Sequence, residues 1–239
     1  MKKLLISASL VLATLAASAQ DYKPLKGAAT AEFGVTGGIS NTALTLNNGG
    51  GQLRFRYFLA DQLAARVGFN ITSSSTKSMV YEAGNTGNEG SRVSKTSGIT
   101  FNLGVEKHFT GSDRLSTYLG ADLLIVKNGA SGKDENYNGG VYSKDYNVTY
   151  KGRNPAGTAT SSFGWGLRLV GGADYYFIEN VYLGGEFGWG FTSTKNGKTS
   201  VATTPGTGAP TTTVENKSTG SAFTLTPQII TGIRLGFKF

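Results

Sequence analysis

The chain of 239 residues contains 35 glycines and 11% aromatic residues but only 16% charged residues, and its mean hydropathy is slightly negative. A soluble globular domain carries about 25% charged residues, so this composition argues against one. No cysteine is present, which excludes disulfide scaffolds, thiolate metal sites and thiol catalysis. The formal net charge of +8 is spread over single lysines and arginines without a nucleic-acid-binding motif, so we expect no nucleic-acid partner.

The first 19 residues have the three parts of a secretory signal peptide. Residues 1–3 are positive, residues 4–15 are apolar but too few to span a bilayer, and residues 17–19 are small enough for a signal peptidase. We therefore expect residues 1–19 to be cleaved, which leaves residues 20–29 as a periplasmic N-terminal segment. A retained membrane helix is the alternative, but polar residues follow the apolar stretch at once.

A hairpin pattern recurs three times along the rest of the chain. Each copy is a strand that ends in aromatic residues, then a turn of a few residues, then a new strand. Long stretches rich in Gly, Ser, Thr, Asn and Lys separate the copies, and we expect them to be extracellular loops: residues 74–96, 128–160 and 195–219. Short turns at one end and long loops at the other are typical of bacterial outer-membrane barrels.

The hairpins set the expected number of strands. A first strand at residues 30–45, a short loop at 47–51 and a last strand ending at Phe239 complete a set of eight. We therefore predict an all-β fold, a closed antiparallel up-and-down transmembrane β-barrel over residues 30–239. An even strand number puts both termini in the periplasm. Alternation around Val148 leaves two alternatives, a hairpin above the membrane or a total of ten strands.

Period-2 alternation assigns the two faces of each strand. In the strand from Phe163, odd positions are apolar and even positions are small or charged. Trp165 and Tyr175 are ten residues apart, about 33 Å along a strand and about 25 Å after a ~40° tilt, which is the height of a lipid-facing band. The expected aromatic girdle on this face contains Tyr57, Phe109, Trp165, Tyr175, Phe177, Trp189 and Phe191.

The same alternation puts five acids and five arginines on the inner face. These residues are Glu32, Arg54, Arg56, Arg66, Glu106, Asp122, Arg168, Asp174, Glu186 and Arg234. The interior of an eight-stranded barrel is just wide enough for side chains, and charges there must be paired. We therefore expect an Arg/acid network that closes the interior, with inward glycines making room for it. A selective pore lined by the same charges is the alternative.

No combination of residues predicts catalysis, a cofactor or a bound metal. The single histidine, His108, is expected at the periplasmic rim, away from the outer leaflet where barrel enzymes work. Asp134, Glu135 and Asp145 could bind Ca²⁺ only loosely, because their spacing fits no calcium-binding loop. Residues 197–199 lack the upstream glycine of a phosphate-binding loop.

With the signal peptide, the hairpin repeat and residues 232–239 in view, the chain resembles the small Gram-negative outer-membrane β-barrel proteins of the OmpX and OmpA transmembrane-domain type. The signal peptide is similar to those of Bacteroidetes. The resemblance implies a location in the outer membrane, with membrane lipid, lipopolysaccharide and the barrel-assembly machinery as partners. It also implies that Leu235, Phe237 and Phe239 form the insertion signal; the alternative is that Phe239 is only a girdle residue.

Two non-enzymatic functions follow from these expectations. In the first, the barrel is a membrane anchor that displays its loops for adhesion, for binding of an unidentified extracellular ligand, or for envelope structure. In the second, it is a small passive channel for minor solutes, similar to OmpW. A soluble lipocalin-like ligand-binding barrel is a remote alternative, because it would need the apolar face turned inward. The balanced interior charge favours the anchor.

Overall fold

A computed structural model describes residues 22–36, 50–206, 208–217, 220–226 and 232–239 of the chain. The expected signal peptide and part of the first expected strand lie outside these residues. The regular elements of the described residues are all strands, and no helix among these residues is long and apolar enough to span a membrane. The strands are β1 (Ala29–Thr36), β2 (Gly50–Ala60), β3 (Leu63–Glu82), β4 (Asn85–Phe109), β5 (Leu115–Asn138), β6 (Val141–Lys151), β7 (Ser162–Ile178), β8 (Val181–Asn196), β9 (Thr199–Thr204), β10 (Thr212–Asn216), β11 (Ser221–Thr226) and β12 (Gly232–Lys238).

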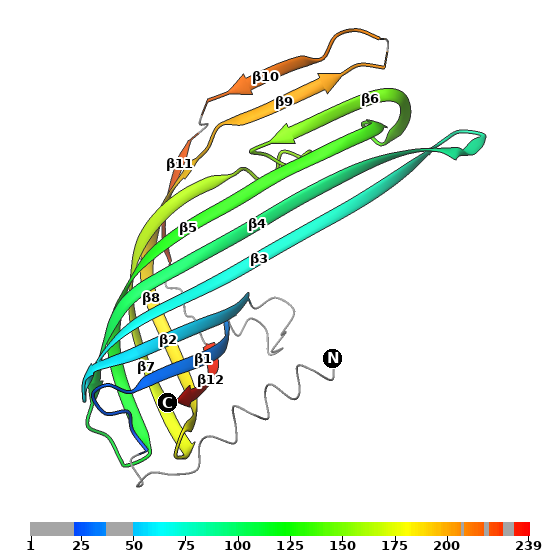
Figure 1. Ribbon diagram of the computed structural model, residues 1–239. Coiled ribbons are helices and arrows are strands. Elements are labelled where there is room, and N and C mark those ends of the chain that lie inside the picture. Colours follow the sequence, from blue (N-terminus) through cyan, green and yellow to red (C-terminus); the bar gives the residue numbers. More distant parts are fainter. Residues whose placement is uncertain (1–21, 37–49, 207, 218–219, 227–231) are drawn as a thin grey trace.

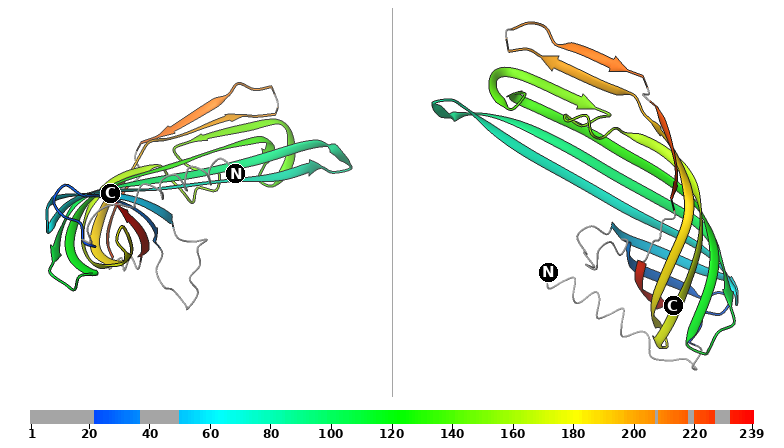
Figure 2. Two further views of the ribbon diagram at one scale, coloured as in Figure 1. Left: turned by 60° about the horizontal axis from the view of Figure 1, so that its bottom comes forward. Right: turned by 180° about the vertical axis from the view of Figure 1, so that it is seen from behind.

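Eight of these strands close into a ring, which is seen nearly end-on in the left view of Figure 2. The ring runs β1, β2, β3, β4, β5, β7, β8 and β12, and β12 pairs again with β1; every pairing is antiparallel. The predicted closed eight-stranded barrel is therefore confirmed. The ten-strand alternative is wrong, because β6 pairs with the far part of β5 outside the ring.

Short turns join the strands at one end of the ring, as predicted. Only two residues, Asp61 and Gln62, separate β2 from β3, and residues 179–180 separate β7 from β8. The start of β1 and the C-terminus meet at this same end, where the Phe239 N–H donates to the Ala29 carbonyl at 2.9 Å. The ring thus closes beside its tightest turns.

The strands extend unequally at the opposite end. Strands β3, β4 and β5 have 20, 25 and 24 residues, and in Figure 1 they continue far beyond β1, β2 and β12. Strands β6, β9 and β10 add to this sheet in the order β5, β6, β9, β10. We call this part the extension. It consists of β6, β9 and β10, the part of β3 after Ile71, the part of β4 before Ile99 and the part of β5 after Lys127.

The extension corrects the expectation of long loops. Residues 74–96, 128–160 and 195–219 are for the most part paired strands, with β3 and β4 in register from Leu63 to Tyr81. Side chains 71–78 are all exposed, on both faces of the sheet. With water on both sides, the apolar/polar alternation that identifies a strand in a sequence disappears. The sequence prediction therefore mistook polar strands for loops.

Strand β5 changes neighbour where the extension leaves the ring. It pairs with β7 up to Asn128 and with β6 from Ser131 onward. Between them, the Ala130 N–H donates to Ser161 Oγ at 2.9 Å, so a side chain takes the place of the missing neighbour strand. The loop between β6 and β7, residues 152–161, lies against the sheet, because a Cβ at Gly132 would be 2.3 Å from Pro155 Cδ.

The ring itself has the two faces that the alternation predicts. Along β7 the burial pattern alternates residue by residue, with Trp165 and Leu169 at least half exposed and Arg168 and Val170 buried. The outer surface of the ring is therefore largely apolar, and the charged side chains predicted for the inner face point inward. A soluble barrel with an apolar interior is excluded for this chain.

Candidate functional site

All ten side chains predicted to face the interior are buried there, with exposed fractions of 6% or less. They come from β1, β2, β3, β4, β5, β7, β8 and β12, so every strand of the ring contributes to one cluster. We call these ten residues the charge network.

Arg56 lies at the centre of the network and contacts three carboxylates. Its guanidinium donates to Glu106 at 3.0 Å and to Asp174 at 2.8 Å, and it forms an ion pair with Glu32 at 2.5 Å. It also donates to the Tyr182 hydroxyl at 2.7 Å. A fully buried guanidinium is tolerated only with such a complete set of acceptors.

Arg66 and Arg168 share Asp122 on the β5 side of the interior. Arg66 makes a two-pronged contact with both Asp122 oxygens at 2.5 Å, and its Nη1 also donates to Glu106 and Glu186. Arg168 Nε donates to Asp122 at 2.9 Å. The planar fork of arginine makes this geometry possible, and a lysine could not reproduce it.

Arg54 and Arg234 complete the network on the side of β1, β8 and β12. Arg54 makes a two-pronged contact with Glu186, with both hydrogen bonds at 2.8 Å. Arg234 donates to Asp174 at 2.9 Å and to Glu32 at 3.1 Å. Five arginines thus neutralise five carboxylates inside the ring.

Three buried tyrosines, which were not among the predicted site residues, occupy further positions in the interior. Tyr118, Tyr176 and Tyr182 are each 2% exposed or less, and the Tyr118 hydroxyl donates to Glu186 at 2.7 Å. All three occupy even positions on strands whose even positions face inward, so the alternation could have found them. They were not assigned to the interior because tyrosine is also common in the aromatic girdle.

Some inward glycines make room for these large side chains. A Cβ at Gly236 would lie 2.0 Å from Tyr182 Cζ, and one at Gly104 would lie 2.2 Å from Asp122 Oδ1. The two positions therefore allow the tyrosine ring and the carboxylate to lie against the wall of the barrel.

His108 faces the interior and does not lie on the rim. It is 3% exposed, its Nδ1 is 2.9 Å from Ser116 Oγ, and its Nε2 is 3.2 Å from Glu106 Oε2. Phe58 and Tyr118 lie against its ring. The order serine, histidine, acid resembles a hydrolase triad, but the serine is buried, so a substrate carbonyl has no access to it.

The predicted girdle residues point outward. Tyr57, Phe109, Trp165, Tyr175, Phe177 and Trp189 are 43% to 56% exposed, and Phe191 is half-buried. Phe191 contacts Trp165 edge-on at 5.7 Å and stacks on Phe223 at 5.4 Å between ring centroids.

A second cluster lies in the extension. Arg92 makes a two-pronged contact with Asp134 at 2.7 and 2.8 Å, and its guanidinium lies 4.4 Å from the centre of the Tyr137 ring. The hydrogen bond to Asp134 raises the pKa of Arg92. The Tyr150 hydroxyl donates to Asp134 at 3.1 Å. Partial burial, and to a smaller extent the Asp134 carboxylate, raise the pKa of Tyr150. These contacts tie β4, β5 and β6 together.

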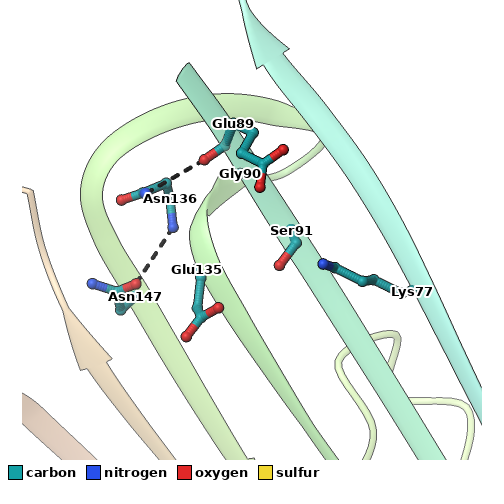
Figure 3. Close-up of a pocket in the computed structure, with 7 residues that line it drawn as sticks. All are labelled: Lys77, Glu89, Gly90, Ser91, Glu135, Asn136 and Asn147. Atoms are coloured by element: carbon teal, nitrogen blue, oxygen red, sulfur yellow. Dashed lines mark hydrogen bonds between the residues drawn. The ribbon is translucent and has the colours of Figure 1, made fainter. Parts of the chain in front are cut away.

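A polar pocket of about 400 Å³ lies near the tip of the extension (Figure 3). Asn136 holds its shape: Nδ2 donates to the Glu89 carbonyl at 3.5 Å, and its backbone N–H donates to Asn147 Oδ1 at 3.4 Å. The pocket is lined by Lys77, Glu89, Gly90, Ser91, Glu135, Asn136 and Asn147.

The three carboxylates considered for calcium do not converge. Asp134 and Glu135 are adjacent in β5, so they point to opposite faces of the sheet; Asp134 pairs with Arg92, and Glu135 pairs with Lys133. No group of three metal-ligating side chains occurs in the described part of the chain.

The comparisons with known proteins identify a family. A family model described as "Putative OmpA-OmpF-like porin family" matches residues 51–239. No curated protein matches the chain. Similar solved structures include the N-terminal β-barrel domain of OprF from Pseudomonas aeruginosa (13% identity over 90% of this chain and 98% of that one, TM-score 0.42). They also include a major outer membrane protein from Thermus thermophilus (14%, 89% and 99%, 0.45) and Ail, the attachment invasion locus protein of Yersinia pestis (11%, 90% and 100%, 0.36).

Proposed function

Because the chain belongs to the OmpA-OmpF-like porin family and is an outer-membrane β-barrel protein, we propose that it is a non-enzymatic membrane anchor that presents the extension outside the cell. In this function the barrel carries no solute, and the extension is the part available to extracellular ligands or neighbouring envelope components.

The filled interior is the observation that carries the proposal. The largest fully buried side chains include Arg56, Tyr118, Tyr176 and Tyr182, all inside the ring. The hydrogen bonds of the charge network link strands that are not neighbours in the ring, for example from Arg54 on β2 to Glu186 on β8. A solute that crossed the barrel would have to break several charge-assisted hydrogen bonds at once. The filled interior therefore favours an anchor over a channel.

Single-channel recording in planar bilayers tests the closed interior. We expect no steady openings from the wild-type protein under conditions in which an open-pore barrel conducts. Steady, reproducible openings would overturn the anchor and favour the passive channel.

The absence of cysteine allows a direct test of orientation. We expect Asn85→Cys, at the tip of the β3–β4 hairpin, to react with a membrane-impermeant maleimide on intact cells. Asp61→Cys, in the β2–β3 turn at the opposite end, is the matched control and should react only after the outer membrane is permeabilised. The reverse pattern would show that the extension faces the periplasm and would remove the display function.

We also propose that the C-terminal strand carries the insertion signal. Leu235, Phe237 and Phe239 share the outward parity, and the Phe239 side chain is 62% exposed. Deleting Phe239 should lower the yield of protein in the outer membrane, whereas Phe239→Tyr should not. An ordinary yield after the deletion would reduce Phe239 to a girdle residue.

A further inference from the structure

The outward residues change from apolar to polar along several strands of the barrel. On β3, β4 and β8 the continuous apolar run of outward residues ends at Ile71, Ile99 and Phe191, and the next outward residue on each strand is a serine. On β5 the next outward residue after Ile125 is Lys127. A band of serines and lysines, with the aromatic Phe163 among them, therefore begins beyond the apolar belt, where a lipid headgroup region would start.

Three lysines occupy this band. Lys127 and Lys195 both pair with Phe163 of β7, one from each side, so their backbones are about 10 Å apart across two strand spacings. Lys95 lies between Ser75 and Ser131 in register, about 13 Å along β4 from Ile99. All three side chains are exposed. We call them the interfacial lysines.

No carboxylate neutralises the interfacial lysines on these strands. Strands β3, β4, β5, β7 and β8 are described in full, and their outward positions carry no acid until Glu89 and Glu135, farther along the extension. Glu135 is itself paired with Lys133. The band thus keeps an uncompensated positive charge, which attracts anionic headgroups.

A hydroxyl-lined hollow of about 510 Å³ contains Lys95. The lining residues are Ser73, Ser74, Ser75, Lys95, Thr96, Ser97, Gly129, Ala130, Ser131 and Ser161. Six of the ten hold outward positions, and the hollow has no side chain at Gly129, where a Cβ would lie 2.6 Å from Ser97 Oγ. Hydroxyl and ammonium donors together suit the oxygens of a phosphate and of a sugar.

We propose that the interfacial lysines and this hollow bind the phosphorylated sugar headgroup of a glycolipid in the leaflet next to the extension. The lysines supply the charge that the phosphates need, and the serines supply donors and acceptors for the sugar hydroxyls. The assignment to the outer leaflet depends on the proposed orientation of the extension, but the binding chemistry does not.

The test measures lipid retention by the purified, folded protein. Detergent-solubilised protein is mixed with bisphosphorylated lipid A or with the same lipid after removal of its phosphates, and bound lipid is counted by native mass spectrometry. The variant is Lys95→Gln/Lys127→Gln/Lys195→Gln. The matched control, Lys133→Gln/Lys144→Gln/Lys198→Gln, loses the same charge elsewhere in the upper part of the molecule.

We expect wild type and control to retain the phosphorylated lipid at least about tenfold better than the dephosphorylated one, and the interfacial variant to lose this preference. A Lys→Arg triple variant should keep it. Heat-modified gel mobility shows that each variant is folded. An equal preference in the variant and the wild type, or an equal loss in the control, would overturn the site.

Two further outcomes are decisive. Equal retention of phosphatidylglycerol would overturn the assignment to a glycolipid, because that lipid has no phosphorylated sugar. Since the binding is measured in detergent, a failure of the orientation or conductance experiments leaves it unaffected, and the two proposals can fail separately.

Discussion

The barrel interior and the outward band beyond the apolar belt use different cations on the same strands. The chain has eight arginines, and five of them belong to the charge network; none of the fifteen lysines does. The outward band beyond the apolar belt contains lysines, and none of its basic residues on β3, β4, β5, β7 and β8 is an arginine. On these strands, arginine pairs with the buried acids and lysine occupies the exposed outward band.

The physical reason is the cost of dehydration. A buried cation must replace all its water contacts, and the five fixed donors of arginine do so in paired contacts such as that of Arg66 with Asp122. The lysine ammonium is more strongly hydrated, and it remains charged at a wet surface without a fixed partner. The interior is thus a closed electrostatic unit, while the band is open to external anions.

The largest effect is expected from removing an arginine of the charge network, which tests whether buried arginines stabilise the interior. Arg56→Met removes the cation shared by Glu32, Glu106 and Asp174, and we expect a loss of about 3–5 kcal/mol because buried charges are left unpaired. Urea unfolding in lipid vesicles measures it. Arg114→Met, an exposed arginine at the turn end, is the control and should change little. Equal stability of the two variants would show that the network does not stabilise the barrel.

A charge on the outside of the ring tests the apolar belt. Leu169→Arg places a cation at a 64% exposed outward position of β7, and we expect a cost of about 2–4 kcal/mol in a bilayer. The same change at Val214 of β10 in the extension should be nearly neutral, because that residue meets water. Vesicle unfolding compares the two, and a neutral Leu169→Arg would contradict the position of the belt.

The glycine contacts are expected to have a smaller effect. In Gly236→Ala the new Cβ would meet the Tyr182 ring, so we expect a loss of about 1–3 kcal/mol from overpacking. Gly185→Ala is matched, since its Cβ would have no neighbour within 4 Å. Combining Gly236→Ala with Tyr182→Ala should cost less than the sum of the single changes. Additive costs would mean that the ring and the glycine are not coupled.

The smallest effect concerns Tyr150 in the extension. Its pKa is raised by partial burial and by Asp134, so the folded protein holds this proton more tightly than the unfolded chain does. Its contribution to stability is therefore present at neutral pH and is lost as the pH rises through the folded pKa. The tyrosinate absorbance of Tyr150 is the difference between the wild-type titration and that of Tyr150→Phe. We expect it to appear at a pH above the ordinary range of tyrosine, and we expect Asp134→Asn to lower the pH at which it appears. An ordinary titration would contradict the contact.

The ring was predictable because each of its strands separates lipid from a packed interior. Because of that separation, apolar and polar residues alternate along each strand. The alternation predicted that Arg54, Asp122 and Glu186 share the inner face, although it did not predict their partners. The pairing itself was not predictable, since five arginines and five acids on eight strands allow many combinations. Strand register and tilt decide, for example, that Arg54 meets Glu186 across the barrel.

The extension was less predictable for a related reason. Strand β3 continues from Phe69 into the serine-rich part of the extension without a break in register, but no apolar face marks the continuation. Threonine and serine occur in both loops and wet strands, so composition favoured loops. The interior position of His108 was missed although it shares the even parity of Glu106, because its nearness to a turn suggested a rim.

The change of neighbour along β5 has a consequence for how such proteins diversify. Ser161 supplies the hydrogen bond that a strand would otherwise give to Ala130, so the register of β5 with β7 does not depend on what β6 does. Insertions at the Gly139–Gly140 turn would lengthen an outer hairpin without shifting any ring strand. The surface that meets the environment can therefore evolve independently of the part that must assemble in the membrane.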